Sequence, residues 1–260
     1  MFIPNKHSQN HLAFRLAFSL WLSPIFSYTQ IVNIENQRLK GNKNGWGGNF
    51  DLSFSVIQNT KSIFQFGNRN RITYKKDLHS YMLLTDILVV KSANESFANS
   101  GFEHFRYSYN TQKHSFLSLE GFQQAQYNRV QLIDFRLLLG GGARMTVLDR
   151  DSAAVNVGTF VMYEYEEQTD DITNSMMRFS TFLSFDFQVT KNFGFNCITY
   201  FQPAVFNAYD FRVSTEASLR MNITQKLKFR ITYNLIYDSE PPVTVPNANY
   251  ILTNSFSYTL

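Results

Sequence analysis

The stretch from Asp210 to Ile223 alternates without interruption between two kinds of side chain. Its odd positions are apolar or small, and its even positions are Asp, Arg, Ser, Glu, Ser, Arg and Asn. Because successive side chains of a β-strand point to opposite faces, this pattern predicts a strand with one apolar and one charged face. At about 14 residues it is much longer than the usual strand of roughly 5 or 6. It is long enough to cross a bilayer, which takes about 9 to 11 tilted residues.

The same alternation recurs along most of the chain and predicts about twelve strands. They are expected at residues 45–56, 62–75, 81–91, 101–110, 115–127, 131–146, 153–166, 175–189, 194–202, 210–223, 227–238 and 250–260. Apolar outer faces, polar inner faces and an even strand number are typical of bacterial outer-membrane barrels. We therefore expect an all-β fold: a single up-and-down antiparallel transmembrane β-barrel of about 12 strands in the cell outer membrane. The facing of 81–91 is ambiguous because nearly all of its residues are apolar, although Asp86 favours the inner side.

The N-terminus has the pattern of a secretory signal peptide. Lys6 and Arg15 make it mildly basic, an apolar run covers 16–26, and small residues precede Gln30. The alternative is an N-terminal membrane helix, but the run is shorter than the roughly 20 residues that a helical span needs, and a proline interrupts it. The expected organisation is a signal peptide at 1–29, a periplasmic lead-in segment at 30–44 and the barrel at 45–260.

Composition agrees with an alternating chain. Hydrophobic residues make up 44% of the sequence and the mean hydropathy is −0.24, because apolar and polar residues are interleaved rather than clustered. The formal charge of +4 falls to +2 once Lys6 and Arg15 leave with the signal peptide, so nothing suggests a nucleic-acid partner. Cys197 is the single cysteine, which excludes an internal disulfide and a multi-cysteine metal site, and its strand phase predicts a lipid-facing thiol.

The inward phase of the predicted strands collects charged residues of both signs. They are Arg69, Arg71, Asp86, Arg106, Glu120, Asp134, Arg136, Arg144, Glu164, Arg178, Asp186, Asp210, Arg212, Glu216, Arg220 and Arg230. Unpaired charges in a narrow lumen would each cost several kcal/mol, so we expect most of them to form pairs that hold neighbouring strands together. The alternative is a charged pore lining that selects solutes. Several large apolar residues, among them Phe160 and Phe182, share this phase and predict a narrow or partly plugged lumen.

Two further patterns each allow a structural and a functional interpretation. Gly140-Gly141-Gly142 lies inside a predicted strand, where glycine is costly unless the sheet bends or another group comes close. A barrel corner is the structural interpretation and the approach of a ligand the functional one. Tyrosines in the apolar phase, such as Tyr107 and Tyr163, predict an interfacial girdle rather than a sugar-binding ladder.

The connections predict how the barrel is oriented. Short turns at 111–113, 148–152, 190–193 and 224–226 alternate with longer links at 92–100, 167–174, 203–208 and 239–249. Since barrels have short periplasmic turns and longer outer loops, both termini are expected in the periplasm. The last strand, 250–260, repeats apolar residues at every second position, as in the terminal strands that barrel-assembly machinery recognises. The expected partners are this machinery, outer-membrane lipid and lipopolysaccharide.

Several motifs resemble a known family. They are Gly101–Tyr107 (GFEHFRY), Glu120–Gln124 followed by Tyr127-Asn128, Leu137–Arg144, Tyr163–Glu166, Tyr200–Pro203 and Asp210–Arg212. Over residues 30–260 the chain is similar to the salt-induced outer-membrane protein family, a group of unknown biochemical activity. The resemblance implies a barrel in the outer membrane and no catalytic residues.

Three functional hypotheses remain open. The first is a structural or stress-related envelope barrel of unassigned activity, and the second is a narrow passive channel for small polar solutes or ions. The third, a lipid-modifying enzyme, would need a His-x-Ser pair on one strand face. His79 and His114 are each followed directly by Ser, so that the two side chains would point to opposite faces. We therefore expect no enzyme, no catalytic residues, no cofactor and no metal.

Overall fold

The computed structural model describes residues 35, 38, 44–58, 62–92, 95–112 and 116–258, without the side chains of 57 and 95–98. The expected signal peptide at 1–29 lies outside the described residues, as does most of the segment 30–44. Within the described residues, no helix has both the length and the apolar character needed to span a membrane.

Twelve strands form one sheet. They are β1 (Gly45–Gln58), β2 (Ser62–Lys76), β3 (His79–Ser92), β4 (Glu95–Asn110), β5 (Leu117–Asn128), β6 (Ile133–Arg150), β7 (Ala153–Gln168), β8 (Thr173–Thr190), β9 (Phe193–Pro203), β10 (Phe211–Asn222), β11 (Leu227–Asp238) and β12 (Ala248–Tyr258). A short 3-10 helix, η1 (Arg129–Gln131), joins β5 to β6. Every strand pairs antiparallel with its neighbours in sequence, which confirms the all-β, twelve-stranded, up-and-down fold.

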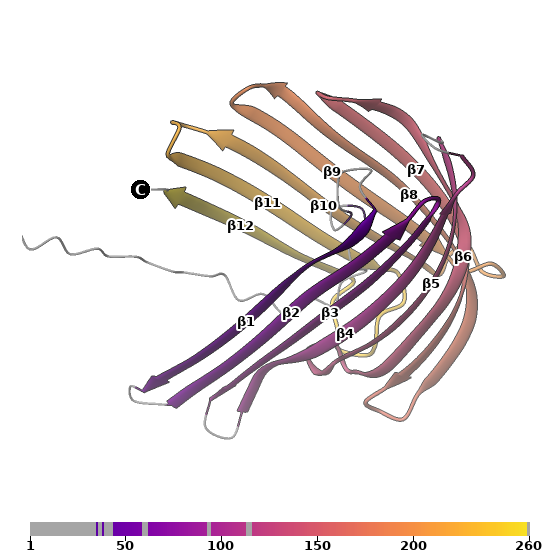
Figure 1. Cartoon of the computed structure of the whole chain (residues 1–260). Helices are drawn as coiled ribbons and strands as arrows, with labels where there is room; N and C mark the ends of the chain where they lie inside the picture. The colour runs from indigo at the N-terminus through magenta and orange to yellow at the C-terminus, as the bar shows by residue number, and fades with distance from the viewer. Residues whose placement is uncertain are drawn as a thin grey trace, which may run out of the picture.

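The sheet is strongly curved, and β1 and β12 are its two edge strands (Figure 1). Over the described residues, β1 hydrogen-bonds only to β2 and β12 only to β11. Gly45, the first residue of β1, and Tyr258, the last of β12, lie at the same end of the sheet as the β6–β7 turn. We call this the β6–β7 end and the opposite one the β7–β8 end.

The two faces of the sheet differ in the way that the alternation predicts. In β7, Phe160 and Glu164 on the inner face are 3% and 2% exposed. Val161 and Tyr163 on the outer face are 42% and 39% exposed. Charged side chains are therefore buried while apolar ones are exposed, the reverse of a soluble fold. The inner face is the concave side of the curved sheet and contains the functional candidates.

Strand β3 resolves the ambiguous facing of 81–91. Met82 and Leu84 are buried on the inner face, and Asp86 shares their phase. The expected long connection at 92–100 is wrong, because β4 already begins at Glu95 and pairs with β3 from Ser92 onwards. The register between β3 and β4 shifts between Val90 and Lys91. Beyond this shift, the small and polar residues at the start of β4 pair with β3 instead of forming a loop.

The start of β6 also differs from the expected alternation. Between Ile133 and Phe135 the register with β7 shifts by one residue, so Asp134 lies in a bulge. Ile133, which the sequence pattern placed on the outer face, is buried instead, with 2% of its surface exposed. Asp134 is partly exposed and binds Arg129 in η1, its Oδ1 atom lying 2.7 Å from Nη1.

The triple glycine of β6 makes room for neighbouring side chains. A Cβ atom on Gly140 would lie 2.6 Å from the ring of Phe122, and one on Gly142 would lie 2.1 Å from the carbonyl oxygen of Thr159. Gly158 of β7 is similarly covered, because its Cβ would lie 2.2 Å from the ring of Phe182. A side chain at these positions would overlap groups of the adjacent strands, which explains why they are glycine. This explanation differs from both the barrel corner and the ligand approach that the sequence suggested.

Candidate functional site

The inner face carries three successive layers, which follow one another along β7. Glu164 and Glu166 lie toward the β7–β8 end and belong to a cluster of ion pairs. Phe160 lies in the middle and belongs to an aromatic layer. Asn156 lies toward the β6–β7 end and lines a large polar cavity.

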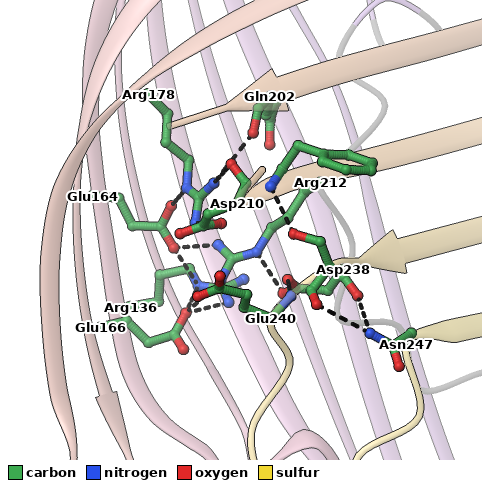
Figure 2. Close-up of polar contacts among 12 residues, drawn as sticks. Arg136, Glu164, Glu166, Arg178, Gln202, Asp210, Arg212, Asp238, Glu240 and Asn247 are labelled. Carbon is green, nitrogen blue, oxygen red and sulfur yellow. Dashed lines mark hydrogen bonds and ion pairs between the residues drawn. The ribbon is translucent and has the colours of Figure 1, made fainter. Parts of the chain in front are cut away.

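The ion-pair cluster is centred on Glu164, whose carboxylate is bound by three arginines from three strands (Figure 2). Its Oε2 atom lies 2.6 Å from Nε of Arg178 in β8, and Oε1 lies 3.4 Å from Nε of Arg136 in β6. The third partner of Glu164, bound through Oε1, is the guanidinium of Arg212 in β10. Two neighbouring strands and one distant strand thus meet at a single buried side chain.

Further carboxylates complete the cluster. Glu166 accepts a hydrogen bond of 2.6 Å from Nε of Arg136 and lies 3.2 Å from Nη2 of Arg212. Asp210 lies 2.8 Å from Nη2 of Arg178, and Asp238 accepts a 2.6 Å hydrogen bond from Nε of Arg212. Three arginines therefore face four carboxylates, so nearly all the charge is compensated within the cluster.

The pair formed by Arg212 and Glu164 connects β10 to β7, although β8 and β9 lie between these strands in the sheet. A side-chain contact that skips two strands must pass across the concave interior. Since Glu164, Glu166 and Arg178 are almost fully buried, neighbouring side chains cover this part of the concave face.

The aromatic layer lies next to the cluster. Phe122, Phe160, Phe182 and Tyr200 come from β5, β7, β8 and β9, and successive ring centroids are 5.9, 6.2 and 5.4 Å apart. The guanidinium carbon of Arg106 lies 5.1 Å from the centroid of Phe122 and 5.3 Å from that of Phe160, within the range of cation–π attraction. Together with the covered glycines, this packing fills the middle of the inner face from β5 to β9.

A second charge centre lies on the β6–β7 side of the aromatic layer. Glu120 of β5 accepts a 2.7 Å hydrogen bond from Nη1 of Arg106 in β4. Arg38, which precedes β1, places Nη2 within 2.8 and 2.7 Å of the two oxygens of the same carboxylate. On the opposite side of Arg106, Nε lies 3.3 Å from Nε2 of His104, whose Nδ1 is 2.9 Å from Oε1 of Gln124.

The cavity at the β6–β7 end has a volume of about 1630 Å³. Hydroxyl and amide groups line much of it, together with charges of both signs that include Arg144, Glu216 and Arg230. Arg220 and Asp186 form an ion pair in its wall, with 2.5 Å between Nη2 and Oδ1. The cavity is large enough for a small polar molecule.

Comparison with known proteins identifies the family. A family model described as "Protein of unknown function, DUF481" matches residues 59–259. The chain belongs to the DUF481 family. This membership confirms the resemblance to an outer-membrane barrel family of unknown activity. A solved structure described as the NanC porin is 9% identical, with 83% of this chain and 98% of that chain covered and a TM-score of 0.44. No curated protein matches the chain.

The structure of this DUF481 chain brings seven of the sequence-predicted charges into two groups. Arg136, Glu164, Arg178, Asp210 and Arg212 lie in the ion-pair cluster, while Arg106 and Glu120 form the second centre. Arg144 is linked to the second centre through Glu35, which binds both Arg144 and Arg38, and its guanidinium also bonds to Thr146 and Asn156.

The remaining predicted charges lie outside these groups. Arg69 pairs with Asp86 at 2.6 Å on a more exposed part of the face, and Arg71 donates a 3.2 Å hydrogen bond to Asn49. Arg230 is exposed and forms no ion pair with a described residue, and Asp134 binds at the bulge as given above. Cys197 is free and half-buried. Within the described parts of the chain, no group of three or more His, Cys, Asp or Glu residues could hold a metal ion.

Four charged residues of the DUF481 chain were not among the predicted site residues. Glu166 and Asp238 occupy even positions of β7 and β11, so the alternation that identified Glu164 also carried a signal for them. Glu35 and Arg38 precede the first strand, where no alternation exists. Their contacts with the inner face depend on the path of the chain before β1, which no sequence pattern indicates.

Proposed function

We propose that this protein is an integral outer-membrane β-barrel whose interior is closed by its own side chains, and that it serves the envelope as a structural or stress-related component. The observation that carries the proposal is the contact of Arg212 in β10 with Glu164 in β7, which passes over β8 and β9 on the concave face. Rings of charged side chains that face the pore are one way in which a channel selects the ions that pass. Here the charges of the cluster bind one another and are buried.

The outer face supports a membrane location. Trp46, Tyr74, Tyr81 and Tyr107 form a row across β1 to β4, with successive ring centroids 4.7, 6.2 and 5.2 Å apart. Rings that combine an apolar body with a polar group favour the membrane interface. The proposed partners of this face are outer-membrane lipid and lipopolysaccharide, with the assembly machinery acting on β12 during insertion.

A second candidate function is a narrow passive channel for small polar solutes. The polar cavity of about 1630 Å³ favours it, because solute could enter from the β6–β7 end. To cross the barrel, the solute would then have to pass the aromatic layer and the ion-pair cluster. We therefore place this function second.

A catalytic role has no support from the two histidines that the structure describes. His79 lies 2.8 Å from the hydroxyl of Tyr107, and His104 bonds to Gln124 and Arg106. Neither ring has a serine hydroxyl among these hydrogen-bond partners, as a histidine that activates a nucleophile would need. We propose that the protein is not an enzyme, and lipid profiles that change on overexpression would contradict this.

The proposed function is tested by liposome swelling with purified, folded protein and a small neutral sugar such as arabinose. A closed barrel gives no swelling above protein-free liposomes at high protein load, while deletion of the gene alters tolerance to osmotic stress. A known open porin in the same lipids is the positive control. Swelling that scales with protein load and falls with sugar size would support the channel instead.

A further inference from the structure

Glu35 and Arg38, which precede the first strand, bind each other through backbone and side chain. The backbone N–H of Arg38 donates to the carbonyl oxygen of Glu35 at 3.2 Å, and Nε of Arg38 lies 2.6 Å from Oε1 of Glu35. The two side chains therefore present a carboxylate and a guanidinium as one unit, which we call the N-terminal pair.

The N-terminal pair contacts the wall of the polar cavity at two points. Arg38 binds both oxygens of Glu120 through Nη2 and lies 3.5 Å from the hydroxyl of Ser108 through Nη1. Glu35 accepts a 3.0 Å hydrogen bond at Oε2 from Nε of Arg144. The cation of the pair thus meets a wall carboxylate, and its carboxylate meets a wall cation.

The wall residues have other partners of their own. Glu120 is also bound by Arg106 at 2.7 Å, and Arg144 donates to Asn156 at 2.6 Å and to Thr146 at 3.0 Å. Each wall residue therefore keeps hydrogen-bond partners within the sheet, and Glu35 adds a carboxylate partner for Arg144. The pair is an addition that matches the charge pattern of the wall.

The two carboxylates in these contacts are buried, while the Arg38 side chain is 24% exposed. The side chain of Glu35 is 6% exposed and that of Glu120 is fully buried. Burial alone lowers the pKa of Arg38, but the carboxylates of Glu120 and Glu35 outweigh it and raise this pKa above its usual value. Arg38 therefore stays protonated at any physiological pH.

We propose that the N-terminal pair is a docking element, in which Glu35 and Arg38 are held at the cavity wall by binding Arg144 and Glu120. The pair is covalently tethered, so its effective concentration at the wall is high, and a solute entering the cavity would have to displace it. This inference goes beyond the proposed function, since the pair could dock in a closed or in a conducting barrel.

The test is trypsin cleavage after Arg38 in purified protein folded in detergent micelles, followed by mass spectrometry. Docking makes cleavage of the Arg38–Leu39 bond slow compared with the heat-unfolded chain. Arg144→Gln and Glu120→Gln each remove one wall contact without changing residues near the scissile bond. Each is expected to speed cleavage about tenfold, because a hydrogen bond between charged groups is lost.

Asp186→Asn is the matched control, because it alters another carboxylate of the cavity wall whose partner is Arg220 rather than the pair. Its cleavage rate is expected to equal that of the wild type. Heat-modifiable migration in electrophoresis establishes that each variant is folded. Cleavage of folded wild type as fast as the unfolded chain, or an unchanged rate in folded Arg144→Gln protein, would overturn the proposal.

Discussion

Glu164 is the residue on which the interior depends most. Its carboxylate binds Arg136, Arg178 and Arg212, and none of these arginines has free access to water. A buried ion network contributes little net stability compared with an apolar one, but removing one member leaves the others uncompensated. Any rearrangement of the strands that separated members of the cluster would therefore leave buried charges uncompensated.

Replacing Glu164 by Gln is expected to lower the free energy of unfolding by about 3 to 5 kcal/mol, because three buried arginines lose their common carboxylate. The measurement is urea-induced unfolding in lipid vesicles. Glu167→Gln is the control, since Glu167 lies on the same strand and instead binds the hydroxyl of Tyr165 at the outer face. Equal stability of the two variants would show that the cluster is not energetically important.

Strand β6 shows how glycines make room for groups of the neighbouring strands. Gly140 and Gly142 lie beneath groups of β5 and β7, whereas Gly141 points away and a Cβ there would meet only the carbonyl oxygen of Glu120, at 3.5 Å. The aromatic layer can form across these strands because inward glycines alternate with inward rings.

Gly142→Ala is expected to destabilise the barrel by about 1 to 3 kcal/mol, because the added Cβ would overlap the backbone of β7. Gly141→Ala, one residue away, has only an ordinary contact and is expected to leave stability nearly unchanged. Thermal unfolding followed by heat-modifiable electrophoresis compares the two. A Gly142→Ala protein as stable as Gly141→Ala would contradict the packing of this layer.

The elements also show which features a sequence can predict. Alternation identified the twelve strands and the inward phase of residues such as Arg178, because facing follows directly from position parity. It failed at Ile133, where a bulge shifts the parity, and at residues 95–100, where small polar residues extend β4. Parity does not indicate which inward side chains lie close together. The contact of Arg212 with Glu164 depends on the curvature of the sheet, so the sequence could not predict it.

Across the whole molecule, the outer face exposes apolar side chains, whereas the inner face buries charged ones. Leu183 and Phe179 of β8 are 45% and 44% exposed, and the edge strands present even more apolar surface, with Trp46 at 78%. Such a surface is stable in lipid and a liability in water. The proposed membrane location explains why the chain exposes it.

Leu183→Arg, near the middle of β8, is expected to weaken folding into bilayers by about 2 to 4 kcal/mol, since it moves a charge to the centre of the membrane. Ser175→Arg, on the same face but near the β7–β8 end, is expected to cost about 0 to 1 kcal/mol. Folding yield in vesicles over a urea series measures both. A protein that tolerates the two changes equally would not have its outer face in lipid.

The measurement that tests the closed interior most directly is the conductance of purified, heat-modifiable protein in planar lipid bilayers. The buried cluster around Glu164 and the aromatic layer predict a silent barrel, with no discrete steps even at high protein load. Reproducible unitary conductance steps from the wild-type protein would contradict the closed interior.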